Sequence, residues 1–170
     1  IIISANDRVY INPGTTVVCS GSTSGFDIDG KFWAVGTQTD SILFSSVLQD
    51  SLGNAYNGFY FLENSVDTAC IISYVRIEYA YYGFRCLNAS PTLSNSNLWK
   101  CRRGVQLSSS SPTIFGNVIE RSYEYGITMT LGCSPLIEWN EFVNNNSQNT
   151  SPKNQISIGT QGNNSPTILH

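Results

Sequence analysis

The chain has 170 residues, of which 41% are hydrophobic and 12% are charged, and its formal net charge is −3. This is enough apolar material for one domain with a substantial core. The low charge, with no basic cluster, argues against nucleic acid as a partner, because that interaction depends on neutralising phosphates. No run approaches the roughly 20 apolar residues of a membrane span, so membrane insertion is not expected.

Short strands separated by turns are predicted for the N-terminal third. Residues 9–18 should form the first strands, residues 26–30 a short strand and a turn, and residues 31–46 two further strands. Residues 47–57 form an irregular loop in this interpretation, centred on Gly53 and Asn54. We therefore predict irregular coils for residues 1–57.

From residue 58 the sequence repeats itself in steps of 21 to 23 residues. An aliphatic residue opens each copy, another follows five positions later, and a glycine then precedes two alternating apolar residues. The copies open at Ile72, Leu93 and Ile114, and their glycines are Gly83, Gly104 and Gly126. Period-two alternation excludes amphipathic helices, and the step is that of one solenoid coil. We predict an all-β fold, a right-handed single-stranded parallel β-helix, as one domain over residues 1–170 with regular coils at 58–170.

Two kinds of corner recur in this pattern. Serine-proline pairs at 90–91, 111–112, 134–135 and 165–166 precede aliphatic residues, and proline belongs at the first residue of a strand because it cannot donate a ladder hydrogen bond. A second column precedes the second aliphatic position and reads Val75, Ser96, Asn117 and Asn140. Asparagine in this column predicts left-handed backbone and stacking of side-chain amides between coils.

The last coils are interrupted and then end. Residues 144–154 form a polar insertion, expected to be a mobile projecting loop. Residues 164–170 stop at the start of a new coil. The chain is therefore expected either to be a piece of a longer β-helix or to contact further copies of itself head to tail, by strand addition.

The repeat carries a family resemblance. The pattern S-P-[TL]-[LI]-x-x-[NS]-x-[LIF], followed by a glycine and an apolar pair, resembles the parallel β-helix repeat of secreted carbohydrate-associated proteins and of the periplasmic family that matures nitrous oxide reductase. The N-terminal segments, including Asn57-Gly58-Phe59-Tyr60-Phe61, resemble the lead-in of bacterial and archaeal surface proteins with this repeat. The resemblance implies an extracellular or cell-surface location and specifies the fold much more strongly than an activity.

Two glutamates are the candidates for catalysis. One column of the repeat reads Glu78, Trp99, Glu120 and Val143, and Glu78 and Glu120, two coils apart, should lie roughly 10 Å from each other. Two carboxyl groups at a defined separation are what a glycosidase requires. The other interpretation, which we favour, is a surface ladder of ion pairs with the basic residues of the next column. Catalytic activity is therefore not expected.

Asp27 and Asp29 are the candidates for a metal site. They flank Ile28 on one predicted strand, so both carboxylates point to the same face, where they could bind calcium. The Asp29-Gly30 pair also fits the entry to a turn, which we prefer. The five cysteines have no metal-ligand spacing and fall in different columns, so we expect buried core residues and neither zinc, a cofactor nor stacked disulfides.

Aromatic residues are the candidates for ligand binding. They gather in the regular coils: Tyr79, Tyr81, Tyr82, Trp99, Tyr123 and Tyr125. Sugar rings stack on flat aromatic faces with a polar rim, and grouped surface aromatics also mark protein contacts. We therefore predict a structural or binding module whose partner is a polysaccharide or a surface protein. The alternatives are a polysaccharide lyase or glycoside hydrolase domain and a periplasmic maturation or scaffold factor.

Overall fold

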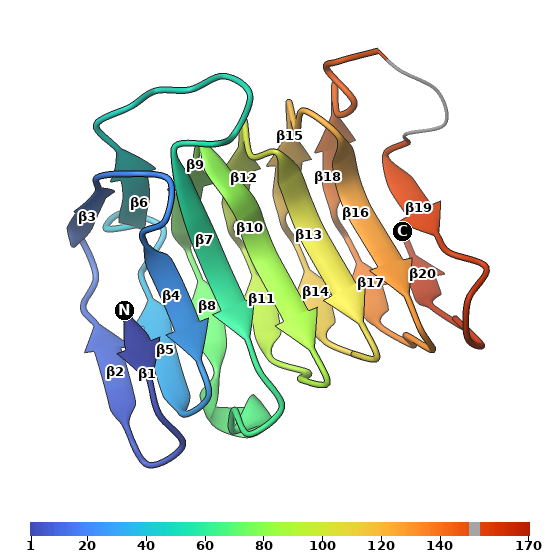
Figure 1. Cartoon of the computed structure of the whole chain (residues 1–170), viewed down its shortest axis with the longest axis horizontal. Coiled ribbons are helices and arrows are strands. Elements are labelled where there is room, and N and C mark those ends of the chain that lie inside the picture. Colours follow the sequence, from blue (N-terminus) through green and yellow to red (C-terminus); the bar gives the residue numbers. More distant parts are fainter. Residues whose placement is uncertain (150–153) are drawn as a thin grey trace.

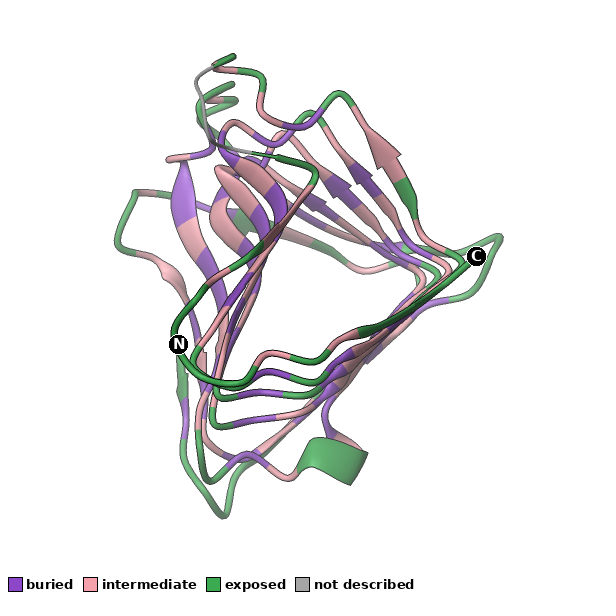
Figure 2. Ribbon diagram, turned by 90° about the vertical axis from the view of Figure 1, so that its right-hand side faces the viewer, coloured by how far each residue is buried: buried purple, intermediate pink, exposed green. Residues whose placement is uncertain are grey.

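The computed structural model describes residues 1–149 and 154–170 and has the predicted solenoid form. The chain winds through about six coils, and each coil contributes one strand to each of three parallel sheets (Figure 1). Viewed along its axis the solenoid is triangular, and buried residues alternate with less buried ones along its walls (Figure 2). We name the three walls sheets A, B and C.

Strands follow the chain in the order A, B, C, so neighbours within a sheet are three elements apart. Sheet A contains β1 (Ile2–Ile3), β4 (Gly25–Ile28), β7 (Tyr56–Phe61), β10 (Ala80–Leu87), β13 (Arg103–Ser108), β16 (Tyr125–Thr130) and β19 (Ile156–Ile158). Sheet B contains β2 (Arg8–Ile11), β5 (Lys31–Val35), β8 (Ile71–Ser73), β11 (Thr92–Ser94), β14 (Thr113–Phe115), β17 (Leu136–Glu138) and β20 (Thr167–Leu169). Sheet C contains β3 (Thr16–Cys19), β6 (Ile42–Ser46), β9 (Val75–Glu78), β12 (Asn97–Trp99), β15 (Val118–Glu120) and β18 (Glu141–Val143).

Helical structure is limited, in the part of the chain that is described, to one 3-10 turn, η1 (Asp67–Ala69), in the connection from β7 to β8. No helix among these residues is long and apolar enough to cross a membrane.

The register of the strands confirms the predicted repeat. In sheet B, Ile72 pairs with Leu93 and Leu93 with Ile114, each pair 21 positions apart. Residues 1–57 also supply strands to the same three sheets, and their coils differ in length. Ile28, for example, pairs with Phe61, 33 positions later. The irregularity of the N-terminal coils therefore lies in their turns, while their strands stay in parallel register.

The core changes in character along the axis. In the N-terminal coils it is built from phenylalanine, with the rings of Phe26 and Phe59 stacked 4.9 Å apart and that of Phe44 edge-on to Phe59 at 4.8 Å. Farther along, the inward positions hold aliphatic side chains such as Leu98 and Ile119, which are fully buried. Each strand buries alternate residues, and this excludes water from the column between the sheets.

A ladder of buried polar side chains lines the corner between sheets B and C. The Nδ2 of Asn117 donates to the carbonyl of Leu93 (3.0 Å) and to Oδ1 of Asn140 (2.9 Å), and Asn117 Oδ1 accepts from the Ser96 amide (3.0 Å). The predicted amide stacking is thus confirmed. The predicted left-handed column is wrong by one position, because positive φ occurs at Tyr74, Asn95, Gly116 and Trp139. The left-handed residue makes the turn, and the residue after it points into the core.

The polar insertion begins with residues that are part of the coil. The Nδ2 of Asn145 donates to the Ile119 carbonyl (2.7 Å), and its Oδ1 accepts from the Ser122 amide (2.9 Å). The amides of Ser147 and Gln148 donate to carbonyls of the preceding coil. The expectation of a projecting loop is therefore wrong for residues 144–148, because these bonds hold the backbone against the solenoid. Residues 150–153 lie outside the described residues.

All five cysteines are free and buried: Cys19, Cys70, Cys86, Cys101 and Cys133. Burial raises the pKa of the Cys101 thiol to about 12 and also raises the pKa values of Cys19, Cys70 and Cys86. Burial therefore blocks access to all five thiols, and in these four it also disfavours the thiolate, which is the reactive form.

We therefore expect Ellman's reagent to modify none of the five thiols within minutes in the native protein, and all five in concentrated guanidinium chloride. Absorbance of the released thionitrobenzoate measures the stoichiometry. Rapid modification of even one thiol at neutral pH in the native protein would contradict the buried assignment for that residue.

Candidate functional site

The corner between sheets C and A carries the candidate site. The residue that follows each of the last four sheet C strands has a positive φ, and these residues form one column: Tyr79, Lys100, Arg121 and Asn144. The next residue turns into the core, as Cys101 and Ser122 do. The turn leaves Lys100 and Arg121 projecting from successive coils, about 4.8 Å apart along the axis.

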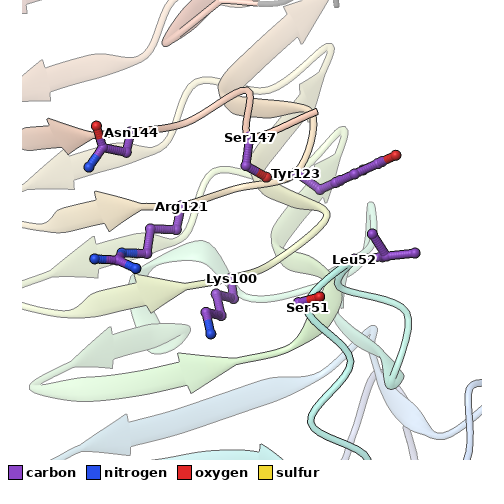
Figure 3. A pocket seen from close by; sticks show the side chains of 7 residues that line it. All are labelled: Ser51, Leu52, Lys100, Arg121, Tyr123, Asn144 and Ser147. Atoms are coloured by element: carbon purple, nitrogen blue, oxygen red, sulfur yellow. The ribbon is translucent and has the colours of Figure 1, made fainter. Parts of the chain in front are cut away.

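A groove of about 480 Å³ runs along this column (Figure 3). Its lining residues are Ser51, Leu52, Lys100, Arg121, Tyr123, Asn144 and Ser147. Asn144, Arg121 and Lys100 lie one below the other, with Ser51 beside Lys100 and Ser147 beside Asn144 (Figure 3). The loop between β6 and β7 contributes Ser51 and Leu52 to the groove, and the segment after β18 contributes Asn144 and Ser147.

The loop between β6 and β7 is held firmly against the corner. Gly53 has a φ of +69°, and a Cβ added there would lie 1.9 Å from the backbone nitrogen of Arg102. Arg102 Nη1 donates to Asn54 Oδ1 (3.3 Å), and the Ala55 amide donates to the Tyr79 carbonyl (3.1 Å). This direct backbone contact, which only glycine permits, positions Ser51 and Leu52 beside Lys100.

Basic residues are concentrated around this corner. Six of the nine lysines and arginines fall within 46 consecutive residues, from 76 to 121: Arg76, Arg85, Lys100, Arg102, Arg103 and Arg121. They lie in neighbouring coils: Arg76 is on β9 of sheet C, Lys100, Arg102 and Arg121 are at the corner, and Arg85 and Arg103 are on sheet A. The prediction that the chain lacks a basic cluster is therefore wrong. The net charge of −3 conceals the cluster because the acidic residues are spread along the whole chain.

Arginine and tyrosine side chains alternate on the outer face of sheet A. The Cζ of Arg85 lies 4.0 Å from the ring centroid of Tyr60 and 4.6 Å from that of Tyr82. The Cζ of Arg103 lies 5.8 Å from Tyr82 and 5.9 Å from Tyr81. These are cation–π distances, so each guanidinium group joins rings from neighbouring positions of the sheet.

The same alternation continues into the groove. The Cζ of Arg102 lies 5.2 Å from the ring centroid of Tyr81 and 5.4 Å from that of Tyr123. Tyr123 also lines the groove. The surface formed by Tyr60, Tyr81, Tyr82, Arg85, Arg102, Arg103 and Tyr123, which we call the tyrosine–arginine face, is therefore continuous with the groove.

Glu124 fixes two members of this face. The residue is only 4% exposed. Its carboxylate accepts hydrogen bonds from Arg102 Nη2 (2.8 Å) and Arg103 Nε (2.7 Å). Burial by itself would raise the pKa of Glu124, but hydrogen bonds and charge from Arg103 and Arg102 outweigh burial and lower it. Because Gln106 Oε1 also accepts from Arg103 Nη1 (2.7 Å), this guanidinium is held in one orientation.

The predicted aromatic residues divide into two groups. Tyr79 is only 5% exposed, so the prediction that it offers a free surface to a ligand is wrong; its ring packs edge-on to Trp99 at 5.2 Å. Trp99 in turn contacts Arg76 and Lys100, at 4.9 and 4.3 Å from the ring centroid. The partly exposed group comprises Tyr81, Tyr82, Trp99, Tyr123 and Tyr125. Cations therefore cover several ring faces that sequence reasoning assigned to sugar stacking.

Glu78 and Glu120 stand in one outer row of sheet C with Trp99 between them in register. Glu78 forms an ion pair with Arg76 and accepts from the Ser45 hydroxyl (3.0 Å). Glu120 accepts from Asn97 Nδ2 (2.9 Å). In the catalytic interpretation, a glycosidic bond would have to lie between the two carboxylates. The Trp99 side chain occupies that position.

Asp27 and Asp29 lie on β4 and directly after it. Asp27 is paired in register with Tyr60. The two carboxylate oxygens of Asp29 accept hydrogen bonds from the backbone N–H and the side-chain Nδ2 of Asn64, each at 3.0 Å. Asp29 therefore organises the loop that follows β7. Among the described residues, no group of three or more histidine, cysteine or acidic side chains is placed to hold a metal ion.

Sequence reasoning assigned Lys100 and Arg121 to the ladder of ion pairs and not to a binding site, and it missed the other residues that give the site its charge: Arg85, Arg102 and Arg103. A signal for them exists, namely the crowding of basic residues between positions 76 and 121. Ser51 had no such signal, because its place beside Lys100 depends on how the loop docks.

Comparison with protein families finds one match, to a model described as a right handed beta helix region, over residues 34–168. Comparisons with curated proteins and with solved structures find no match.

Proposed function

The chain belongs to the right-handed β-helix family, and from this premise we propose that it is an extracellular or cell-surface binding module whose partner is a carbohydrate. The fold supplies a long flat wall on which side chains repeat about every 4.8 Å. The observation that carries the proposal is the tyrosine–arginine face, which is continuous with a groove.

The tyrosine–arginine face combines the two kinds of group that a polyhydroxylated ligand uses. The rings of Tyr60 and Tyr82 contact Arg85, so their hydroxyl edges and the unused guanidinium N–H groups form the outer surface. Guanidinium groups donate several hydrogen bonds in a fixed plane, and tyrosine hydroxyls donate and accept. Binding would therefore rest on hydrogen bonds to sugar hydroxyls, with limited ring stacking.

A contact with another surface protein is the second candidate. Tyrosine and arginine are enriched at the centres of protein interfaces, and cation–π contacts between these two residue types make up the tyrosine–arginine face. Retention by a purified polysaccharide distinguishes the candidates, because a surface that recognises only protein would give none.

We expect the native protein to be retarded in gels containing at least one plant or bacterial polysaccharide, without release of reducing ends or unsaturated products. Arg85→Gln should weaken this binding about fivefold, because it removes the cation between two tyrosine rings. Arg8→Gln, at an exposed position of sheet B, is the matched control and should have no effect.

Two outcomes would count against the proposal. Migration unchanged by every polysaccharide would reject carbohydrate as the partner. Product that accumulates with the native protein and disappears in Glu120→Gln would establish the hydrolase or lyase alternative.

A further inference from the structure

We propose that the groove between the β6–β7 loop and the column of Lys100 and Arg121 binds an acidic group of the ligand, a carboxylate or a sulfate ester. This inference rests on the proposed function, because it assigns the acidic group to a glycan. It selects acidic polysaccharides over neutral ones and gives the groove a role separate from that of the tyrosine–arginine face.

The two cations in the groove are only slightly neutralised by the protein itself. Lys100 has no carboxylate within 4.0 Å among the residues that the structure describes; its ammonium group lies over the ring of Trp99 instead. Arg121 approaches one carboxylate, that of Glu120, at 4.0 Å, and its side chain is 56% exposed. Positive charge therefore remains available in the groove.

The acidic residues of the neighbouring column bond mainly to residues outside the groove, and the 4.0 Å approach of Glu120 to Arg121 is their one close contact with the two cations. Glu78 pairs with Arg76, and Glu120 accepts from Asn97. Both belong to the row immediately before Lys100 and Arg121, which is where compensating charge would be expected. A bound anion would supply the missing negative charge.

Stacking two like charges in adjacent coils has a cost. Lys100 and Arg121 occupy equivalent positions one coil apart, and like charges directly opposite on neighbouring strands destabilise a sheet. The corner nevertheless keeps both on left-handed backbone, which is itself unfavourable for residues other than glycine. An anion that contacts both side chains would relieve their repulsion, and it would accept charge-assisted hydrogen bonds from the guanidinium group.

Neutral hydrogen-bonding groups complete the lining. Hydroxyls of Ser51, Ser147 and Tyr123 and the amide of Asn144 border the groove. They can bond the remaining oxygens of a carboxylate or sulfate and the sugar hydroxyls beside it. Because Tyr123 belongs both to the groove and to the tyrosine–arginine face, one chain of acidic sugars could occupy both.

The test measures binding of defined polymers to the whole chain at fixed ionic strength. Polygalacturonate supplies carboxylates, dextran sulfate supplies sulfate esters, dextran is the neutral arm, and single-stranded DNA is the polyphosphate arm. The variant is Lys100→Gln with Arg121→Gln. The matched control is Arg8→Gln with Lys31→Gln, because these residues are also cations paired in register on neighbouring strands and their removal changes the net charge equally.

We expect the groove variant to weaken binding of polygalacturonate, dextran sulfate or both about tenfold, and the control variant to leave it almost unchanged. The stronger of the two acidic arms identifies the ligand group. Without ligand, the groove variant should unfold at a temperature close to that of the native protein, because the like-charge contact that it loses offsets the lost contact of Lys100 with Trp99. Weakened binding would then not reflect misfolding.

The remaining outcomes separate the two proposals. Equal binding of dextran and the acidic polymers, unaffected by the groove variant, would overturn the groove assignment and leave the carbohydrate module intact. If both double variants weakened the binding of the acidic polymers equally, the effect would be due to net charge alone. That result would also overturn the groove assignment. Tighter binding of DNA than of either acidic polysaccharide would reject the assignment to a glycan, and retention by no polymer at all would reject the proposed function itself.

Discussion

Gly58→Ala is expected to lower the free energy of unfolding by about 3 kcal/mol or more. Gly58 has a φ of +89°, and a Cβ added there would lie 1.8 Å from the Tyr82 carbonyl oxygen. β7 lies between β4 and β10 inside sheet A, and the register with β10 shifts between Tyr82 and Arg85. The glycine thus lies at a bulge, where the close neighbour is backbone and cannot rotate away.

Gly21→Ala is the control for this substitution. Gly21 also has a positive φ, of +100°, but an added Cβ would meet nothing within 4 Å. It should therefore cost only about 1 kcal/mol, the penalty of left-handed backbone alone. Urea denaturation followed by far-ultraviolet circular dichroism gives both values. Equal losses in the two variants would mean that the close approach of β7 and β10 adds nothing, contrary to the proposed cause.

The regular coils could be predicted because their turns differ in length by no more than two residues between residues 72 and 137. When Ile72, Leu93 and Ile114 are equally spaced in sequence, a one-to-one parallel register places them in one column. The N-terminal coils hide the same register, because surface turns vary in length without disturbing the strands. The 33-residue step from Ile28 to Phe61 therefore conceals a pairing that alternation alone cannot reveal.

The candidate site was harder to predict, because it depends on contacts between distant segments. Ser51 lies beside Lys100 only since Gly53 lets two backbones touch. The cation–π contacts were equally hard to see in the sequence, because partners such as Arg85 and Tyr60 come from neighbouring coils. Column alignment could have shown the pairing of Arg85 with Tyr60, had the longer turn before β7 been placed correctly. Sequence reasoning instead treated the aromatic rings as free surfaces.

Glu124→Gln is expected to lower the free energy of unfolding by about 2–3 kcal/mol at neutral pH. The substitution keeps the shape of the side chain but removes the charge that pairs with Arg102 and Arg103. Two guanidinium groups then lie against a buried neutral amide. Tyr81, which contacts both arginines, should also become more mobile, and glycan binding should weaken through this loss of positioning.

The pH dependence of this loss distinguishes a charge effect from a packing effect. Hydrogen bonds and charge from the two arginines hold the pKa of Glu124 below its ordinary value despite burial. A carboxyl with a depressed folded-state pKa contributes stability that is present above the unfolded-state pKa and is lost as pH falls through the folded-state pKa. The difference between the native protein and Glu124→Gln should therefore be constant from neutral pH down to about pH 5 and shrink below it. Urea denaturation at a series of pH values measures the difference, and Glu63→Gln, at an exposed position, serves as the control. A difference that stays the same down to the lowest accessible pH would attribute the loss to packing and contradict the ion-pair assignment.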